Sequence, residues 1–364
     1  MIDRLVDRAL NRTARHDPVV MRPEVAAFHG ATPIVDLLVG TPLFRRSFLR
    51  RLGHGHVDLP RAREGGLDVI GFTIATRFPD LRGTLSAPHF AALGVPLDRL
   101  GDDLAMAEFF LDRIDGWVAA SGGGLAPWSP AAPVPMPGDA IGCIAGIQGG
   151  QVLAGDLRRV ERLRARGVRM MALAHVMDTP LAGSGTGRGA GGLTGFGREA
   201  IAELERCGVI VDLAHASIVA IREALPLVRR PFVLSHTGFI ARSAGRSHWR
   251  RYASATRNLP DDVVREAGEA GGLIGVTLAT DLVGGGTMDH VVRAFAHAVA
   301  LVEPERVALG SDFDGALRLP FDVTGLPALT QALLDAGFGR EVVAAILGGN
   351  ALRLLRGAAG AAPR

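Results

Sequence analysis

The 364-residue chain contains no lysine, so all 40 of its basic side chains are arginines, and it has a single tyrosine. The arginines are interspersed among 37 acidic residues and form only short clusters, such as Arg45-Arg46 and Arg250-Arg251. A nucleic-acid-binding surface requires a contiguous basic patch or stripe, which this distribution does not supply. We therefore expect no nucleic-acid partner.

Cysteine is also scarce, because Cys143 and Cys207 are the only two and they form no CxxC pair. Both lie in or beside apolar segments, which is typical of buried free thiols in a reducing compartment. Residues 1–16 alternate charged and aliphatic side chains and lack the apolar core of a signal peptide. No apolar run is long enough to cross a bilayer. These absences predict a cytoplasmic protein with no membrane partner.

Short apolar segments dominate what is present, and they alternate with helical ones in a single series. Eight strands are expected at 33–39, 67–75, 141–147, 168–174, 209–213, 232–234, 273–278 and 306–309. Helices are expected at 100–120, 156–166, 197–206, 260–269 and 288–302. Such alternation predicts parallel βα units, and eight of them favour a (βα)8 TIM barrel. An open doubly wound sheet is the alternative, and the absence of GxGxxG after the first strand weakens it.

The series has no linker and no solenoid repeat, so residues 1–364 are expected to form one barrel domain. A helical lead-in at 1–31, with one amphipathic helix, precedes it. The Gly-, Pro- and Ala-rich stretch 121–137 is expected to be a loop. The Gly-rich stretch 183–192 lacks the GK[ST] of a phosphate-binding loop, which favours a flexible βα loop over the barrel mouth.

Polar side chains follow the expected strands at the end where barrel enzymes carry their chemistry. They are Gln148, His175, His215, His236 and Asp312. Neutral imidazoles that hold a divalent ion, together with a carboxylate that moves protons, are the components of metal-assisted hydrolysis. A lone histidine at such a position is more often a core residue bonded to carbonyl groups. Matching positions on consecutive strands favour a metal site for His215 and His236.

These residues lie within a set of motifs that resembles the membrane (renal-type) dipeptidase family of zinc peptidases. The motifs are DLPRAREGG at 58–66, LTGFG at 193–197, VDLAH at 211–215, SH at 235–236, RNLPDD at 257–262, GSDFDG at 310–315 and GGN at 348–350. They are collinear from about Ile34 to Leu355. The resemblance implies a TIM barrel of the metallo-dependent hydrolase type that carries two metals and cleaves dipeptides.

The resemblance also implies roles for individual residues. His215 and His236 match the two histidines that bind one zinc ion, and Asp312 matches the aspartate that shuttles protons. His175 matches the histidine that polarises the scissile carbonyl and so contacts substrate. Arg257 matches the arginine that pairs with the substrate carboxylate, a role suited to a guanidinium fork.

Three positions depart from the family pattern. Leu38 and Gly40 stand where the family has the His-x-Asp pair that binds the other zinc, and Gln148 replaces its bridging glutamate. An amide is a poor substitute because it brings no negative charge to offset two cations, so Gln148 is only a weak candidate ligand. We therefore expect at most one zinc ion, or none.

The nearby His54-Gly55-His56 could in principle replace the lost ligands. Because Asp58 belongs to the stretch that leads into the second strand, this segment is expected toward the opposite, stability face of the barrel. A surface or helix-capping role is therefore favoured over metal ligation for His54 and His56.

Two functional hypotheses follow. In the first, the chain is an enzyme with altered or reduced activity that hydrolyses dipeptides or related small amides. In the second, it is a catalytically silent homologue that binds a small amide or a partner protein. The presence of His175, Arg257 and Asp312 favours the enzyme. The expected ligand is a small dipeptide-like molecule, and a homodimer is allowed.

Overall fold

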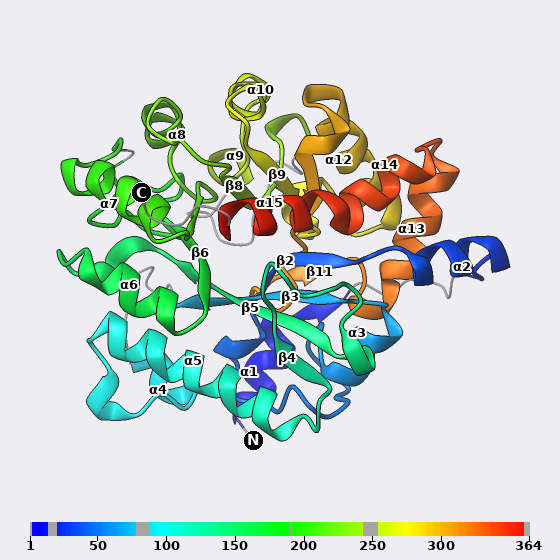
Figure 1. The fold of residues 1–364 in the computed structure, drawn as a ribbon, viewed down its shortest axis with the longest axis horizontal. Helices are drawn as coiled ribbons and strands as arrows, with labels where there is room; N and C mark the ends of the chain where they lie inside the picture. The colour runs from blue at the N-terminus through cyan, green and yellow to red at the C-terminus, as the bar shows by residue number, and fades with distance from the viewer. Residues whose placement is uncertain (1, 14–19, 78–87, 190, 243–253, 360–364) are drawn as a thin grey trace.

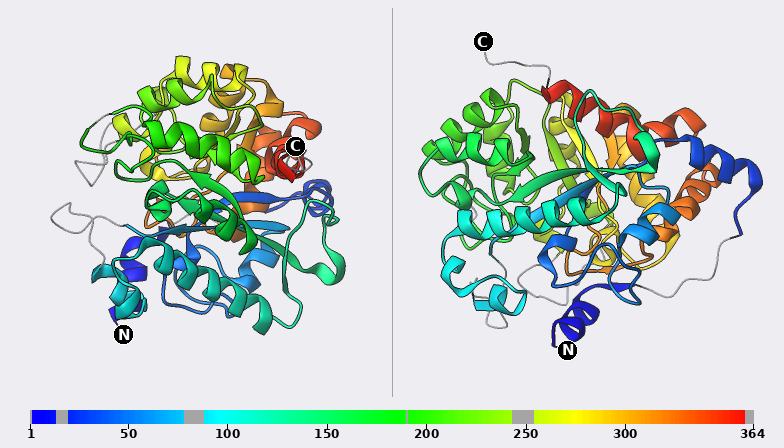
Figure 2. Two further views of the ribbon diagram at one scale, coloured as in Figure 1. Left: turned by 60° about the vertical axis from the view of Figure 1, so that its left-hand side comes forward. Right: turned by 60° about the horizontal axis from the view of Figure 1, so that its bottom comes forward.

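A computed structural model of the chain describes residues 2–13, 20–77, 88–189, 191–242 and 254–359. Eight parallel strands, in the order β10-β9-β8-β7-β6-β5-β3-β2, form a nearly closed barrel (Figures 1 and 2). Their bounds are β2 Val35–Val39, β3 Val69–Ala75, β5 Ile141–Gln148, β6 Val168–Ala172, β7 Ile210–Asp212, β8 Val233–Thr237, β9 Leu273–Val276 and β10 Val307–Leu309. All eight correspond to predicted strands, so the TIM-barrel prediction is confirmed.

Helices surround the sheet in Figure 1. They are α1 Ile2–Leu10, α2 Pro23–Ala31, α3 Leu59–Glu64, α4 Pro88–Ala92, α5 Asp103–Ala120, α6 Arg158–Ala165, α7 Gly195–Arg206, α8 Ile218–Ala224, α9 Ser254–Arg257, α10 Asp261–Glu269, α11 Thr280–Val283, α12 Met288–Leu301, α13 Leu326–Asp335, α14 Arg340–Ala344 and α15 Asn350–Ala359. The five predicted helices match α5, α6, α7, α10 and α12. Side-chain N-caps fix where α7 and α8 begin, because Thr194 and Ser217 each accept a backbone N–H from the first turn of the helix that follows. None of the described helices is both long and apolar enough to span a bilayer.

The strands carry apolar side chains on both faces because both faces are buried. A large core lies between the sheet and the helices. A second core takes at least one residue from each barrel strand, including Val35, Val69, Ile144, Met170, Ile210, Val233, Leu273 and Ala308. The C-terminal helix α15 packs on this second core through Leu352 and Leu355. Apolar packing therefore fills one end of the barrel and leaves polar chemistry to the other.

The first and last strands of the barrel are joined just beyond their regular ladders. Gly40 N donates to the Phe313 carbonyl at 2.7 Å, and Asp312 N donates to the Leu38 carbonyl at 3.2 Å. Asp36, fully buried on β2, accepts the Ser311 N–H at 2.9 Å and the Ser311 hydroxyl. These bonds connect the carboxyl ends of β2 and β10.

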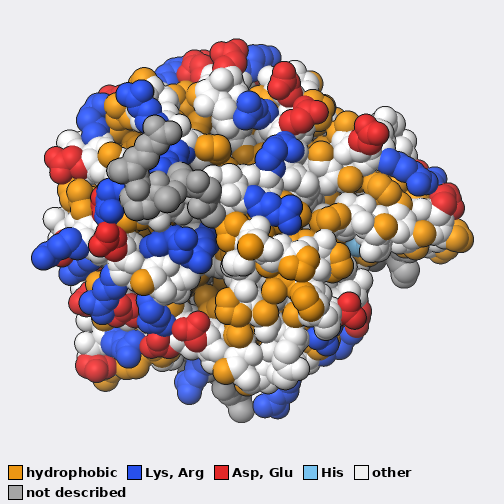
Figure 3. Space-filling view, in the orientation of Figure 1, with side chains coloured by type: hydrophobic (Ala, Val, Ile, Leu, Met, Phe, Trp, Pro, Cys, Tyr) orange, Lys and Arg blue, Asp and Glu red, His pale blue; other side chains and the backbone are white. Residues whose placement is uncertain are grey.

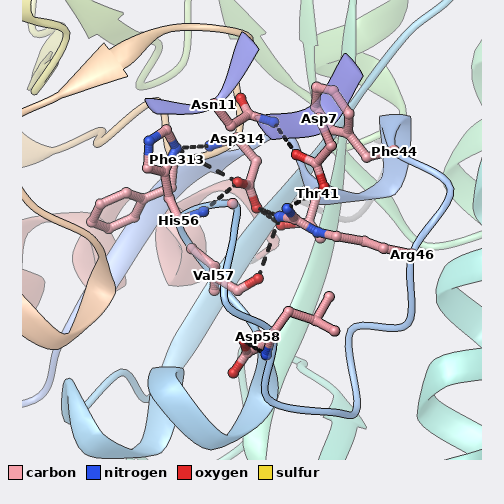
Figure 4. A network of polar contacts seen from close by, with 12 residues as sticks. Asp7, Asn11, Thr41, Phe44, Arg46, His56, Val57, Asp58, Phe313 and Asp314 are labelled. Atoms are coloured by element: carbon pink, nitrogen blue, oxygen red, sulfur yellow. Dashed lines mark hydrogen bonds and ion pairs between the residues drawn. The ribbon is translucent and has the colours of Figure 1, made fainter. Parts of the chain in front are cut away.

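A buried ion-pair network secures this junction (Figure 4). The Asp314 carboxylate accepts bonds from Arg46, from the Thr41 hydroxyl at 2.5 Å and from His56 N at 2.6 Å. Burial raises the pKa of Asp314, but Arg46, His56 and the hydroxyl bond together bring it below its usual value. Asp7 of α1 accepts a second bond from Arg46 at 2.7 Å. The network therefore ties the N-terminal helix to the loops after β2 and β10.

The predicted position and role of His56 were wrong. His56 is fully buried against the loop after β10, and burial lowers its pKa. The neutral ring accepts Asp314 N–H at Nδ1, at 3.0 Å, and is 3.1 Å from the Arg12 carbonyl at Nε2. His54 is also buried, 3.4 Å from Asp7, and neither histidine lies at the opposite end of the barrel. Asp58 is the residue that caps α3, by accepting Arg61 N–H.

Two further predictions needed correction. The expected loop at 121–137 contains a short strand, β4 (Leu125–Pro127), which pairs with β5. The lead-in contains two helices, α1 and α2, and a two-residue strand, β1 (Arg12–Thr13), which pairs with β11 (Arg318–Leu319). Strands of two or three residues, such as β1 and β4, are too short to show the apolar periodicity that identifies strands from sequence.

The network yields a stability prediction. Changing Arg46 to Met leaves Asp7 and Asp314 buried without their counter-charge, so the free energy of unfolding should fall by about 3–5 kcal/mol. Urea unfolding followed by circular dichroism measures this. Arg51→Met is the matched control, because Arg51 pairs with Glu64 at the surface with side chains 57% and 47% exposed. We expect no measurable change for the control. Equal midpoints for the two variants would contradict a structural role for the network.

Candidate functional site

Three histidines meet at the carboxyl ends of consecutive strands, as predicted. His175 follows β6, His215 follows β7 and His236 lies in β8. The ring centroids of His175 and His215 are 4.6 Å apart, and those of His215 and His236 are 4.8 Å apart. The Nε2 atoms of His215 and His236 are separated by 2.9 Å. The structure therefore groups the predicted imidazoles in one place.

A buried carboxylate fixes the tautomer of His236. Asp212 accepts the Ser235 hydroxyl at 2.5 Å, and the same hydroxyl oxygen lies 2.8 Å from His236 Nδ1. Since the Ser235 proton is directed to the carboxylate, the oxygen accepts from Nδ1–H. The lone pair of His236 is consequently on Nε2, which faces His215. This is the arrangement by which an outer carboxylate orients a metal-binding imidazole.

All three imidazoles are neutral at physiological pH. Burial and, after it, the positive charge of Arg257 lower the pKa of His175 to about 3. The pKa values of His215 and His236 are lowered well below the ordinary value, first by burial and then by Arg257. Neutral imidazole is the form that binds metal.

The side chain of Gln148, at the end of β5, lies against the Nε2 atom of His236. Its amide nitrogen is 3.3 Å from His236 Nε2, and its side chain is buried. His215 and Gln148 thus both donate toward the one lone pair of His236. In that arrangement His215 carries its proton on Nε2, and its buried Nδ1 has no hydrogen-bond partner among the described residues. A cation at His236 would therefore displace two protein donors.

Arg257 and Asp312 complete the buried group. Arg257 lies in α9 and donates to the His236 carbonyl at 2.5 Å. Burial raises the pKa of Asp312 to about 7, with the charge of Arg257 opposing the shift and that of Asp36 adding to it. Asp312 adopts φ +65°, a left-handed conformation that is strained for a non-glycine residue. Its carboxyl group can therefore hold or release a proton near neutral pH.

The carboxyl end of β2 offers no side-chain ligand to this group. Leu38 is apolar and buried, and its carbonyl accepts the Asp312 N–H. A Cβ atom at Gly40 would lie 2.4 Å from the Asp314 carbonyl oxygen. The space for any side chain at position 40 is therefore already filled by the backbone of the loop after β10.

The Gly-rich segment contributes backbone support that sequence reasoning missed. Ser184 donates its hydroxyl to the His175 carbonyl at 2.5 Å, and Gly185 N donates to the His215 carbonyl at 2.8 Å. Asp178 in turn accepts backbone N–H groups from Ser184, at 2.8 Å, and from Gly189, at 2.8 Å. The segment was expected to be flexible, but Asp178 organises its described residues. The available signal in the sequence was Asp178, which precedes the Gly-rich segment 183–192 and can accept its backbone N–H groups.

The residues present fit one metal ion better than two. His215 and His236 supply two neutral imidazoles, and the amide side chain of Gln148, which contacts His236, is a neutral third group. Among the described residues, the only group of three His, Cys, Asp or Glu ligand atoms within 4.8 Å of one another lies elsewhere. That group, Glu161, Glu203 and Cys207, already contacts the Arg206 guanidinium.

The chain is similar in sequence to known dipeptidases. The family described as Membrane dipeptidase (Peptidase family M19) matches residues 22–364. Dipeptidase 3 of Macaca fascicularis is 28% identical over 358 residues, covering 90% of this chain and 68% of that protein. Dipeptidase 3 of Homo sapiens is 27% identical with the same coverage of both chains.

Solved structures share the fold. A metallo peptidase from Rhodobacter sphaeroides, liganded with a phosphinate mimic of the dipeptide L-Ala-D-Ala, has a TM-score of 0.75 at 24% identity, covering 90% of this chain and 99% of that chain. The probable dipeptidase PvdM from Pseudomonas aeruginosa has a TM-score of 0.76 at 19% identity, covering 92% and 97%. The structural likeness shows the barrel fold, and the family match over nearly the whole sequence shows that this chain belongs to the membrane dipeptidase family, peptidase family M19.

Proposed function

We propose that this chain hydrolyses dipeptides or related small amides at a metal site that has fewer ligands than the family pattern and holds one divalent ion or none. The observation that carries the proposal is the grouping of His215, His236 and Arg257 in one buried site, with the charges of Arg257 and Asp312 interacting. Family membership supplies the reaction class, a metal-dependent dipeptidase hydrolysis.

Each residue has a role that its surroundings support. Arg257 binds the terminal carboxylate of the substrate, since the bond to the His236 carbonyl uses one of its five N–H donors. His175, neutral and buried beside His215, is assigned to the scissile carbonyl oxygen, and its single N–H must leave the Arg77 backbone to donate there. Asp312 takes and returns a proton at its carboxyl group, because a pKa of about 7 suits proton transfer near neutral pH. A divalent ion held by His215 and His236 would supply Lewis acidity toward the amide carbonyl.

The β2 end of the barrel argues against a second ion. Leu38 has no donor atom, and position 40 has no room for one because the Asp314 carbonyl occupies it. Gln148 carries no charge to hold two cations together. The departure from the family pattern is therefore built into the packing of two loops and is more than the loss of three ligand side chains.

One observation favours the silent homologue as the second candidate. His215 and Gln148 both donate toward the His236 lone pair, so the described polar groups satisfy one another without any ion. In that case the site would bind a small amide through Arg257 without cleaving it.

We also propose a reducing location. Cys143 and Cys207 are free, and burial raises the pKa of the Cys143 thiol to about 12. A thiol held in its protonated form is a poor nucleophile, which is expected of a structural cysteine in the cytoplasm.

The metal proposal is tested by elemental analysis of zinc-reconstituted protein. We expect at most one tightly held ion per chain and poor turnover of standard dipeptides, because a single ion would supply less charge stabilisation than a pair. Gln148→Glu should tighten zinc binding by about tenfold or more by adding a charged ligand beside His236. His236→Ala is the matched negative control. Two tightly held ions in the parent protein, or robust dipeptide turnover, would refute the proposal that the site holds at most one ion.

A second prediction concerns carboxylate recognition. Arg257→Ala should weaken binding of a dipeptide-like ligand by about 1.5–3 kcal/mol, through loss of a charge-assisted hydrogen bond. Calorimetry with a non-hydrolysable dipeptide mimic measures the change, and the amidated mimic, which lacks the carboxylate, serves as control. If both ligands lose the same affinity, Arg257 does not recognise the carboxylate.

The crowded position 40 gives a third prediction. Gly40→Ala should destabilise the fold by about 1–3 kcal/mol, since its Cβ must push the loop after β10 away. Gly53→Ala is the control, because a Cβ there meets no atom within 4 Å. Thermal unfolding of both variants decides the matter, and an undisturbed melting temperature for Gly40→Ala would show that the loop yields freely.

A further inference from the structure

The Gly-rich segment, residues 183–192, contains glycines whose missing side chains allow close contact with other parts of the site. A Cβ atom at Gly187 would lie 1.9 Å from the Asp178 carboxylate, and one at Gly185 would lie 2.5 Å from the Thr256 carbonyl oxygen. A Gly-rich chain loses more conformational entropy on folding than other sequences do, so specific interactions must hold it in place.

Asp178 supplies such interactions from the start of the same loop. Its carboxylate accepts the backbone N–H groups of Ser184 at 2.8 Å, Arg188 at 3.0 Å and Gly189 at 2.8 Å. Oδ1 binds Ser184, and Oδ2 binds the other two. Because Asp178 follows His175 by three residues, one carboxylate close to the site fixes both ends of the stretch 184–189.

The segment in turn holds the backbone of two site histidines. The buried Ser184 hydroxyl donates to the His175 carbonyl at 2.5 Å, and Gly185 N donates to the His215 carbonyl at 2.8 Å. His215 has φ +65°, a left-handed conformation that is strained in a non-glycine residue and persists only where the surroundings fix the backbone. The bond from Gly185 is one such restraint, and it acts directly on the residue that carries the imidazole.

A further contact reaches the arginine of the site. The Thr256 carbonyl that abuts Gly185 belongs to α9 and immediately precedes Arg257. A side chain at position 185 would therefore push the segment and α9 apart. Ser184 also forms an isolated antiparallel bridge with Ala216, which joins the loops after β6 and β7.

A purely structural role would confine Asp178 to satisfying the N–H groups of a surface turn. That role accounts for the two exposed residues that Asp178 binds, but not for the buried Ser184 or for the bonds from the segment to the site. We propose that Asp178 is a positioning residue that holds His175 and His215 in place through the Gly-rich segment. This role rests on the proposed function, because that function assigns substrate and metal contacts to the two imidazoles.

¹⁵N NMR of the full chain, labelled in histidine and free of metal, tests the placement directly. Asp178→Ala should shift the imidazole signals of His175 and His215, which are identified by their loss in His175→Gln and His215→Gln. His297, which bonds Asp261 at 2.9 Å, is the internal reference and should not shift. A purely structural role would lower the melting temperature and leave all three signals in place.

Two further variants make the test specific. Ser184→Ala removes only the hydroxyl bond, should shift the His175 signal, and keeps the test decisive if Asp178→Ala fails to fold. Asp156→Ala is the matched control and should shift neither site signal, because Asp156 likewise accepts a backbone N–H, that of Arg158 at 3.0 Å, but does so before α6. Unshifted site signals in every Asp178 and Ser184 variant that folds, or equal shifts in the control, overturn the proposal.

Zinc calorimetry on the same proteins separates the positioning role from the proposed function. Where the parent binds zinc, Asp178→Ala should weaken the binding about tenfold, at the lower end of the range for outer residues of metal sites, and Asp156→Ala should leave it unchanged. A parent that binds neither zinc nor the dipeptide mimic, with shifted signals in Asp178→Ala, would refute the hydrolase and support the positioning of the imidazoles. A parent that binds both, with unshifted signals, would refute the positioning role alone.

Discussion

The ion pair between Asp314 and Arg46 is the interaction on which the rest of the site depends. Asp312, Asp314 and Ala316 have φ values of +65°, +59° and +62°, so the loop after β10 alternates into a conformation that L-residues avoid. Strain of this kind persists only where the surroundings over-determine the backbone. Arg46 and His56 bind Asp314, and Asn11 accepts Ala316 N–H at 2.9 Å. Asp312, to which we assign proton transfer, is thus placed by residues outside the histidine group.

The same aspartate–serine contact occurs on both sides of the barrel mouth, but a different residue follows the serine on each side. Asp212 accepts Ala214 N–H, Ser235 N–H and the Ser235 hydroxyl, and Asp36 accepts the equivalent three groups from Leu38 and Ser311. Each aspartate therefore joins its strand to the next through a serine. On the β7–β8 side the serine precedes His236 and orients an imidazole. On the β2–β10 side the serine precedes Asp312. Because the residues after Asp36 are apolar, the Asp312 carboxyl group is the polar side chain on this side. The β7–β8 side thus carries imidazoles to which we assign metal binding, and the β2–β10 side carries backbone hydrogen bonds and a carboxyl group.

Sequence reasoning worked where the signal was periodic and failed where long-range polar contacts decide the structure. Eight apolar runs predicted eight strands, and the residues that follow them converge because parallel strands share one carboxyl edge. His56 was misplaced because its partners, Asp314 and Arg12, are far away in the sequence. The filling of the space at Gly40 by the Asp314 carbonyl follows from a loop conformation that no local pattern encodes. The face shown in Figure 3 has acidic and basic side chains interspersed over its described residues, as the scattered charges of the sequence suggested.

Several arginines of this lysine-free chain make sets of hydrogen bonds that a lysine could not make. Arg46 bridges two aspartates, Arg61 bonds Asp58 and Asp322 together with two carbonyls, and Arg113 reaches three carbonyls. Each of these tasks uses several N–H donors arranged in a plane, which a guanidinium presents and an ammonium does not. A lysine at position 46 would place a compact charge between Asp7 and Asp314 without the spread needed to bond both. The geometry of the loops around the barrel mouth therefore depends on the fork of the arginine side chain as much as on its charge.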